Sequence, residues 1–186
     1  MKKQLVILSS PSGGGKSTVA RHLLNVFPQF KLSVSATTRK KRPSELDGKD
    51  YYFLTKDEFE KAIANNDLIE YEEIFGNYYG TLKSQVNEAI NRNEKLLFDI
   101  DVKGALSIKK LYPDLSLLIF LAPPSIEILE SRLRNRKTET EEQIQIRFKR
   151  AQMELAQSEK FDYVVVNDKL DETLTQIEEL VKKECF

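Results

Sequence analysis

The first eighteen residues constrain this chain more than any other segment. Four apolar residues, Leu5 to Leu8, run directly into Ser-Ser-Pro-Ser-Gly-Gly-Gly-Lys-Ser-Thr at residues 9–18. A buried strand, a glycine-rich loop and a helix that begins at Lys-Ser are typical of a phosphate-binding loop. Glycines let backbone N–H groups turn toward phosphate oxygens, where a side chain would collide. The segment therefore predicts a nucleoside triphosphate as ligand, and a glycine-rich turn without a ligand is the structural alternative.

Each residue type in this loop has a chemical use. Lys16 has the reach to contact the β- and γ-phosphates, and the Ser17 hydroxyl can ligate Mg²⁺. The strict motif opens with glycine, whereas this chain has Ser10 at that position. We expect this change to be tolerated, because the crowded inner positions remain glycine. The predicted ATP ligands of the loop are Gly13, Gly14, Gly15, Lys16, Ser17 and Thr18.

Composition limits the class of partner. The chain has 186 residues, which suits one domain with inserted subdomains, and its 29 basic and 29 acidic residues cancel. No global field therefore favours nucleic acid or a membrane surface, and no obligatory protein partner is inferred. The single cysteine, Cys185, excludes an internal disulfide, and no apolar run approaches the length of a transmembrane helix. These features predict a cytoplasmic protein.

Apolar runs without polar alternation recur along the chain and predict strands that are covered on both faces, as in a parallel sheet. Helical patterns lie between these runs, so we expect an α/β fold of the P-loop NTPase type, with a mostly parallel sheet flanked by helices. The predicted strands are Leu5–Leu8, Leu96–Phe98, Leu117–Leu121 and Tyr163–Val166, and the predicted helices are 18–27, 102–111, 125–133 and 170–181.

Two segments interrupt this alternation. Residues 33 to about 93 are mixed, with aromatic-rich strand-like pieces and two helical stretches, the first opened by a capping box at Thr55 to Glu58. Residues about 126–160 are helical and highly charged. We expect a single domain over 1–186, with a core of about 1–32, 94–125 and 161–186, a mixed α/β insertion at about 33–93 and a helical lid at about 126–160.

Two carboxylates follow the second apolar run. Asp99 and Asp101 are two residues apart, so we expect both on the same face at the end of a strand, where α/β sheets bind ligands. In a protein with a phosphate-binding loop, such an aspartate lies beside Mg²⁺ and usually reaches it through water, which is the role expected for Asp99. A plain salt bridge is the alternative.

A basic segment between hydroxyls and tyrosines, residues 33–53, is a candidate for a second phosphate site. Arginines give planar, bidentate contacts to phosphate, and a tyrosine hydroxyl adds one more donor. A solvated basic loop or a nuclear-localisation-like run is the alternative on the residues alone.

Residues 37–53 also resemble the signature of guanylate kinases. Thr-Thr-Arg at 37–39, Arg42, Glu45 and Gly48 stand at the prescribed spacing, and Tyr-x-Phe at 51–53 completes it. The similarity covers nearly the whole chain and includes the phosphate loop, 69–71, 76–81, 99–101, 122–125, the arginine-rich segment with 138–141, and 166–168.

This resemblance implies roles at the acceptor side. The phosphate of GMP would contact Arg39, Arg42, Tyr51 and Tyr79, and the base would contact Ser35, Glu70 and Thr81, with Asp101 as a helper. Guanine presents N1–H and a 2-amino group as donors and O6 with N7 as acceptors, so the Glu70 carboxylate can accept from both donors. Adenine lacks these donors and would leave Glu70 unpaired, at a cost of about 1–3 kcal/mol.

The resemblance also implies that Arg136 and Arg147 are lid arginines that close over the phosphates. Solvated helices with local ion pairs, such as Arg150 with Glu154, are the alternative, and the roles of Arg132, Lys149 and Arg150 stay open. Asn167 and Asp168 match the adenine-side contact of the family. His22 and Cys185 are expected to be structural.

The resemblance thus implies an ATP:GMP phosphotransferase, a nucleoside monophosphate kinase of purine metabolism and GMP recycling that also accepts dGMP. ATP and GMP would be its small-molecule substrates and Mg²⁺ its cofactor, held by Ser17 and Asp99. The catalytic residues would be Lys16, Arg42, Arg136, Arg147 and Asp99. A non-catalytic phosphopeptide-binding module and a kinase of the same fold with another acceptor are the two alternatives.

Overall fold

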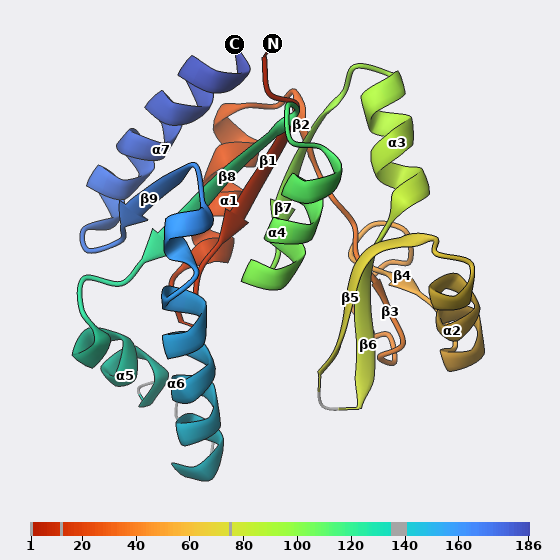
Figure 1. The fold of residues 1–186 in the computed structure, drawn as a ribbon, viewed down its shortest axis with the longest axis horizontal. Helices are drawn as coiled ribbons and strands as arrows, with labels where there is room; N and C mark the ends of the chain where they lie inside the picture. The colour runs from red at the N-terminus through yellow and green to blue at the C-terminus, as the bar shows by residue number, and fades with distance from the viewer. Residues whose placement is uncertain (1, 12, 75, 135–140) are drawn as a thin grey trace.

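The structure is a computed structural model that describes residues 2–11, 13–74, 76–134 and 141–186. Its core is a five-stranded parallel sheet in the order β2-β7-β1-β8-β9, with helices on both faces (Figure 1). The strands are β1 Leu5–Ser9, β2 Phe30–Leu32, β7 Lys95–Asp99, β8 Ser116–Ala122 and β9 Tyr163–Val166. The covering helices are α1 Lys16–Val26, α3 Lys83–Asn91, α4 Val102–Leu111 and α7 Leu170–Cys185.

Successive residues of β1 contribute to opposite sides of the sheet. Val6 and Leu8 pack with α1 and α7, whereas Leu5 and Ile7 pack with α3 and α4. A strand buried on both faces needs apolar side chains at every position, which is why the runs without alternation predicted these strands. The predicted parallel α/β core is confirmed. β2 was not predicted, because it has only three residues and exposes Lys31 and Leu32 at the edge of the sheet.

A second sheet forms a separate layer from residues 36–82, in the order β4-β3-β6-β5. Its strands are β3 Ala36–Thr37, β4 Tyr52–Phe53, β5 Leu68–Ile74 and β6 Asn77–Leu82, and α2 Lys56–Ala64 packs on it. The predicted capping box is confirmed: the Thr55 hydroxyl accepts from the N–H of Glu58, and the Glu58 carboxylate accepts from the N–H of Thr55. A small core of Ala36, Phe59 and Leu68 holds this unit together.

The helix α3 follows the second sheet in sequence but packs on the first. Val86 and Ala89 lie in the core cluster that contains Phe98 of β7. The second sheet itself ends with Leu82, so the packing of the core resumes about ten residues before the expected boundary at residue 93.

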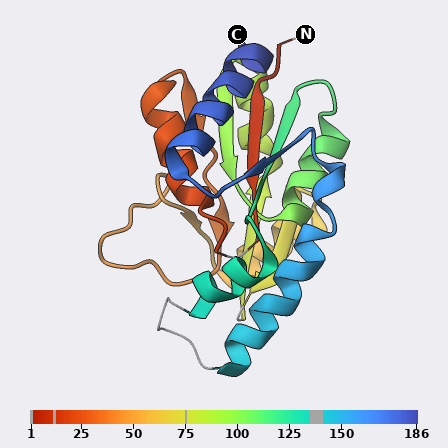
Figure 2. The ribbon, with the colours of Figure 1, turned by 90° about the vertical axis from the view of Figure 1, so that its left-hand side faces the viewer.

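The charged segment forms two helices, α5 Ile126–Arg134 and α6 Glu141–Leu155, followed by the short 3-10 helix η1 Ser158–Lys160. The Ser125 hydroxyl accepts from the N–H of Ile128, so Ser125 caps α5. Leu129 and Leu133 of α5 pack against Ala151 of α6. This helical pair lies beyond the same end of the core sheet as the second sheet (Figures 1 and 2).

Among the described residues, no helix has the length and apolar character needed to cross a bilayer.

The packing of the second sheet generates a testable prediction. Phe59 is fully buried in a cluster that shares no residue with the core clusters. Phe59→Ala is expected to cost about 3–5 kcal/mol, because it leaves a cavity in a core that has few other large side chains. Amide hydrogen exchange should then show a larger loss of protection in β5 and β6 than in β1 and β8.

Ile119→Val in the main core is the comparison variant. It should cause a smaller loss of amide protection, and this loss should occur in the core strands. Equal loss of protection in both sheets after Phe59→Ala would contradict the separation of the two clusters.

Candidate functional site

The loop between β1 and α1 is closely packed around three glycines. Gly13 and Gly15 have φ values of +91° and +86°, which favour glycine. A Cβ on Gly14 would lie 2.6 Å from the Cβ of Ser10, so a side chain cannot be accommodated there without a shift. Gly15 is also the N-cap of α1, and no acidic residue occupies the first turn of this helix. The positive end of the helix dipole, with the N–H groups of the first turn, therefore faces the loop.

Ser10 fits this loop without backbone strain. It is buried, and its hydroxyl donates to the carbonyl of Pro11 over 3.0 Å. Within the described ranges, only Asn66 and Asn93 combine a side chain beyond glycine with a positive φ. The serine in place of the first motif glycine thus leaves the turn intact.

Lys16 and Ser17 lie against the end of the neighbouring strand β7. The Ser17 hydroxyl donates to Asp99 Oδ2 over 2.7 Å. The Lys16 ammonium lies 3.6 Å from Asp99 Oδ1 and donates to the carbonyl of Ile100 over 2.8 Å. The structure therefore brings together the three residues that were predicted to act on the phosphates and the metal.

Asn167 is part of the same loop packing. Its side-chain amide donates to the carbonyl of Gly14 over 2.8 Å, and a Cβ on Gly15 would lie 2.6 Å from its Nδ2. Arg132 of α5 donates to the backbone carbonyl of Asn167 over 3.0 Å. The buried Asn167 side chain thus supports the loop itself, a contact that the sequence did not predict, while Asp168 is exposed.

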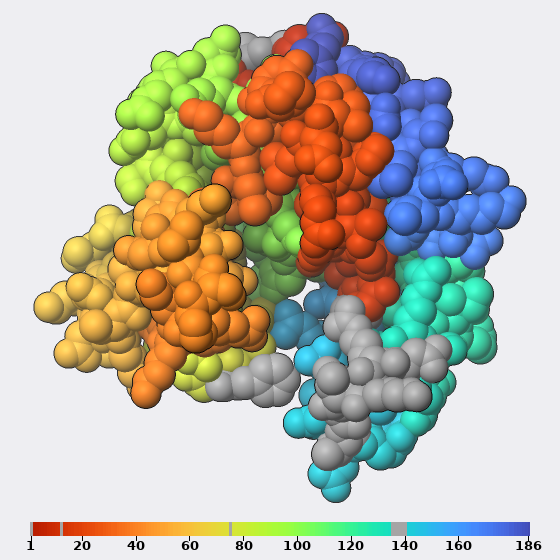
Figure 3. Space-filling model, turned by 180° about the vertical axis from the view of Figure 1, so that it is seen from behind, coloured from red at the N-terminus to blue at the C-terminus, as the bar shows by residue number. Residues whose placement is uncertain are grey.

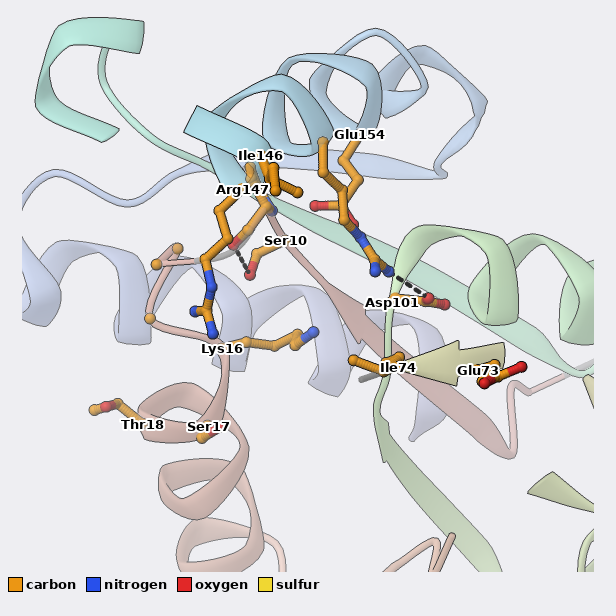
Figure 4. A pocket seen from close by; sticks show the side chains of 15 residues that line it. Ser10, Lys16, Ser17, Thr18, Glu73, Ile74, Asp101, Ile146, Arg147 and Glu154 are labelled. Carbon is orange, nitrogen blue, oxygen red and sulfur yellow. Dashed lines mark hydrogen bonds and ion pairs between the residues drawn. The ribbon is translucent and has the colours of Figure 1, made fainter. Parts of the chain in front are cut away.

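A cavity of about 580 Å³ lies over the loop and is bounded by three parts of the molecule: the core, the second sheet and the helical pair α5–α6. The loop forms its floor, Glu73 and Ile74 come from β5, and Arg147, Arg150 and Glu154 come from α6. Arg147 extends from α6 toward the loop and Lys16 (Figure 4). Arg136 lies outside the described residues, so its predicted role is untested.

A second cavity, of about 270 Å³, lies between the second sheet and the end of β7. It collects Ser35, Tyr51, Glu70, Tyr79 and Asp101, five of the predicted acceptor residues. The hollow between the second sheet and the rest of the molecule is visible in the space-filling view (Figure 3). Asp101 and Ile74 line both this cavity and the one over the loop, so the two cavities are neighbours.

Glu70 is one of the carboxylates that line the second cavity. Its Oε1 accepts from the Thr81 hydroxyl over 2.7 Å across the β5–β6 pair. Burial raises the pKa of Glu70 to about 7, against the lowering effect of the Thr81 hydrogen bond. The close approach of Gly104, where a Cβ would lie 3.2 Å from Glu70 Cδ, contributes to that burial. Glu70 is therefore poised to accept hydrogen bonds from a ligand that compensates its desolvation.

The basic loop is ordered by one glutamate. Both terminal nitrogens of Arg39 donate to Glu45, over 3.0 and 2.7 Å, and the N–H of Arg42 donates to the same carboxylate. These hydrogen bonds lower the pKa of Glu45 to about 2. The Arg39 guanidinium also lies 5.2 Å from the centre of the Tyr51 ring, whereas the Arg42 side chain is exposed. The alternative of a wholly solvated loop does not hold for Arg39.

Asp101 differs from its prediction. β7 ends at Asp99, and Asp101 is instead the N-cap of α4, where its Oδ1 accepts from the N–H of Gly104 over 2.8 Å. The two carboxylates are therefore not neighbours on one face of a strand. Asp101 still lines the second cavity, because the start of α4 lies beside it.

Two site residues were missed or left open. Glu72 lines the second cavity together with Glu70 and Ile74, and the period of two along β5 was the signal that could have identified it. The role of Arg150 was left open in the sequence analysis. Arg150 forms the local ion pair with Glu154 that was given as the alternative, but it also contacts Glu72 and Asp101. His22 pairs with Glu178 of α7 over 2.7 Å and lies away from both cavities, in agreement with a structural role.

Comparisons with known proteins agree on one family. The family model described as guanylate kinase matches residues 2–184. The guanylate kinase of Chlorobium luteolum is 50% identical over 174 residues, which covers 94% of this chain and 88% of that protein. The guanylate kinase of Rickettsia felis is 49% identical over 183 residues, 98% of this chain and 95% of that protein. The crystal structure of guanylate kinase from Anaplasma phagocytophilum superposes with a TM-score of 0.77 at 34% identity, covering 100% of this chain and 87% of that one.

The environment of Glu70 generates a prediction about stability. A carboxyl group whose pKa is raised on folding stabilises the fold below its unfolded pKa of 4.5, and this contribution is lost as the pH rises to about 7. The unfolding free energy of Glu70→Gln minus that of the unmodified chain should therefore increase by about 2–3 kcal/mol as the pH rises from 4.5 to about 8. Urea unfolding at a series of pH values measures the difference.

Glu73→Gln is the control, because Glu73 is an exposed carboxylate on the same strand. Parallel pH profiles for Glu70→Gln and the unmodified chain would show that Glu70 is not desolvated.

Proposed function

The chain belongs to the guanylate kinase family, whose members are ATP:GMP phosphotransferases, and we propose that it transfers the γ-phosphoryl group of ATP to GMP with Mg²⁺, giving ADP and GDP. The observation that supports this most directly is the adjacency of the two cavities. One lies over the phosphate-binding loop, the other is lined by the desolvated Glu70, and Asp101 and Ile74 line both. Two bound nucleotides could thus meet at their phosphates.

On the donor side, the loop N–H groups, Lys16, Ser17 and Thr18 would hold the phosphates of ATP. The Lys16 ammonium already lies at the end of β7, within reach of the boundary between the cavities. Asn167 would act by holding the carbonyl of Gly14, so that the loop keeps its N–H groups turned inward. Asp168, next to it and exposed, would lie at the adenine side.

On the acceptor side, the GMP phosphate would bind Arg39, Arg42, Tyr51 and Tyr79. Glu45 orients Arg39, and the Tyr51 and Tyr79 rings pack edge to face with centres 6.2 Å apart, which places both tyrosines on one side of the cavity. Arg42 is exposed, so its side chain is free to turn toward a bound phosphate without breaking a buried contact. Planar guanidinium groups and phenolic donors suit a dianionic phosphate.

The base would be selected by Glu70 with Ser35 and Thr81. The Thr81 hydroxyl orients Glu70, which leaves the carboxylate directed into the cavity. Guanine would donate N1–H and its 2-amino group to Glu70 and so repay the desolvation that raises the pKa of this group. Adenine has no such pair of donors and would leave the carboxylate without partners.

The residues fit a magnesium ion. Ser17 and Asp99 offer two hard oxygen ligands in mutual contact, 2.7 Å apart. Mg²⁺ is usually held by one or two protein oxygens together with substrate phosphates and water, rather than by a cage of side chains. Accordingly, no group of three or more His, Cys, Asp and Glu side chains suited to a metal occurs in the described ranges. When bound, the ion would neutralise developing charge on the phosphates.

Catalysis would then depend on position and positive charge. Lys16, Arg42, Arg147 and Arg136 would surround the transferred group, and no covalent intermediate or dedicated base is required. Closure of the lid and of the insertion, which consists of about residues 33–93, would exclude water and so prevent hydrolysis of ATP.

We further propose dGMP as an acceptor, a role in purine metabolism and GMP recycling, and a cytoplasmic location.

The acceptor specificity is tested by an ADP-release assay with ATP, Mg²⁺ and each of GMP, dGMP, AMP, CMP, UMP and dTMP. Turnover is expected with GMP and dGMP and not with the others. Glu70→Gln should lower kcat/KM for GMP by about a hundredfold, because the carboxylate is the proposed acceptor of two hydrogen bonds. Turnover of another acceptor would assign a different kinase activity. Absence of any turnover would favour a non-catalytic binding module.

The Ser10 position gives a second test on activity. Ser10→Gly is expected to change turnover by far less than about a hundredfold, because Ser10 adopts an unstrained conformation in the loop. Gly14→Ala is the comparison, since its Cβ would lie 2.6 Å from Ser10 Cβ, and it should reduce turnover strongly. A hundredfold gain on Ser10→Gly would show that the serine impairs the loop.

A further inference from the structure

One arginine side chain of the lid contacts all three parts of the molecule. Arg150 Nη2 donates to Glu72 Oε2 over 2.8 Å and to Asp101 Oδ2 over 3.1 Å, and its Nε donates to Glu154 Oε1 over 3.0 Å. Glu154 is one turn further along α6, Glu72 belongs to β5 of the second sheet, and Asp101 caps α4 of the core. The guanidinium therefore joins lid, insertion and core at one point.

This point lies in the wall between the two cavities. Asp101 lines both of them, Glu72 lines the acceptor cavity, and Arg150 and Glu154 line the cavity over the loop. The ion pair between Asp101 and Arg150 is the dashed line at Asp101 in Figure 4. The Arg150 side chain is 37% exposed and that of Glu154 only 12%, so the cluster is partly shielded from water. Its ion pairs are therefore less screened than surface pairs.

The charges at this point need the guanidinium. Burial raises the pKa of Glu72, and the neighbouring Asp101 carboxyl raises it further, whereas Arg150 lowers it. Burial also raises the pKa of Asp101, but Glu72, the hydrogen bond from the Gly104 N–H and the charge of Arg150 together lower it below its usual value. Two neighbouring carboxylates would repel each other without a cation between them. Arg150 thus favours the arrangement in which β5 and the start of α4 lie close together.

We propose that Arg150 is a positioning residue that couples the lid to the acceptor insertion, through its ion pairs with Glu72 and Asp101. Binding of one nucleotide that stabilises this three-part contact then favours binding of the other. This inference rests on the proposed function, because it assumes a donor and an acceptor nucleotide in the two cavities. Coupling of this kind is reciprocal, so each nucleotide changes the affinity for the other by the same factor.

The lid offers a matched control. Arg134 of α5 also pairs with two carboxylates, Glu130 and Glu141, and both belong to the lid helices. Arg134→Met therefore removes a charge and two ion pairs from the lid without touching a contact to the insertion or to Asp101.

The experiment measures the dissociation constant of GMP by calorimetry, alone and with saturating β,γ-imido ATP and Mg²⁺, and then the reverse titration. In the unmodified chain, each nucleotide is expected to lower the dissociation constant of the other, and the ratio of the constants without and with the second nucleotide should be about three or more. Arg150→Met and Glu72→Gln should each bring this ratio close to one. The double variant should show no further loss, because both changes remove the same contact. Arg150→Lys, which keeps the charge but not the planar fork, should be intermediate.

Three results would overturn the proposal: a ratio of about one in the unmodified chain, an unchanged ratio in Arg150→Met and Glu72→Gln, or an equal loss in Arg134→Met. If Arg150→Met does not fold, as judged by circular dichroism, then Arg150→Lys and Glu72→Gln decide the question. The proposed function fails separately, since it predicts GMP turnover by the unmodified chain whatever the ratio is.

Discussion

The parallel pairing of β1 with β7 is the constraint on which the rest of the site depends. Leu8 lies opposite Asp99 in this pairing, so the loop that follows β1 and the carboxylate that ends β7 emerge at the same edge of the sheet. The contacts of Asp99 with Ser17 and Lys16 follow from this register. A shift of one residue would turn Asp99 to the opposite face of the sheet, away from the loop.

The other two parts of the molecule are built around this edge. The second sheet has its own small core, and the helical pair α5–α6 has few large buried side chains, but Ile69 of β5 and Leu155 of α6 also pack against the core cluster that contains Phe98. Polar contacts add to these links: Arg132 of α5 with Asn167, and Arg150 of α6 with Glu72 and Asp101. Small apolar contacts and polar pairs are less costly to rearrange than a large apolar core, which suits the proposed closure on ligand binding.

The accuracy of prediction differed between core and site for physical reasons. β1 and β8 were predicted closely, because strands buried on both faces must be apolar. β9 was also predicted closely from its apolar run, although this edge strand exposes Val164 and Val166, and α4 and α7 were predicted from their helical patterns. β2 was missed because an edge strand of three residues carries too short a pattern. The sequence pattern predicted Asp101 at the end of a strand, because the apolar run continues to Ile100, whereas Asp101 is the N-cap of α4. Arg136 lies outside the described residues, and its role stays a prediction.

The sequence by itself determined the parallel core, the phosphate-binding loop and, through the signature at 37–53, the family. These are local properties: consecutive residues and short spacings carry them. Only the tertiary structure decided that Asn167 supports the loop, that Glu70 is desolvated beside Gly104, and that Arg150 joins three separate segments. The contacts of Asn167 and Arg150 connect residues that are 153, 78 and 49 positions apart. No local pattern records them, because they arise from the way the three parts pack at one edge of the sheet.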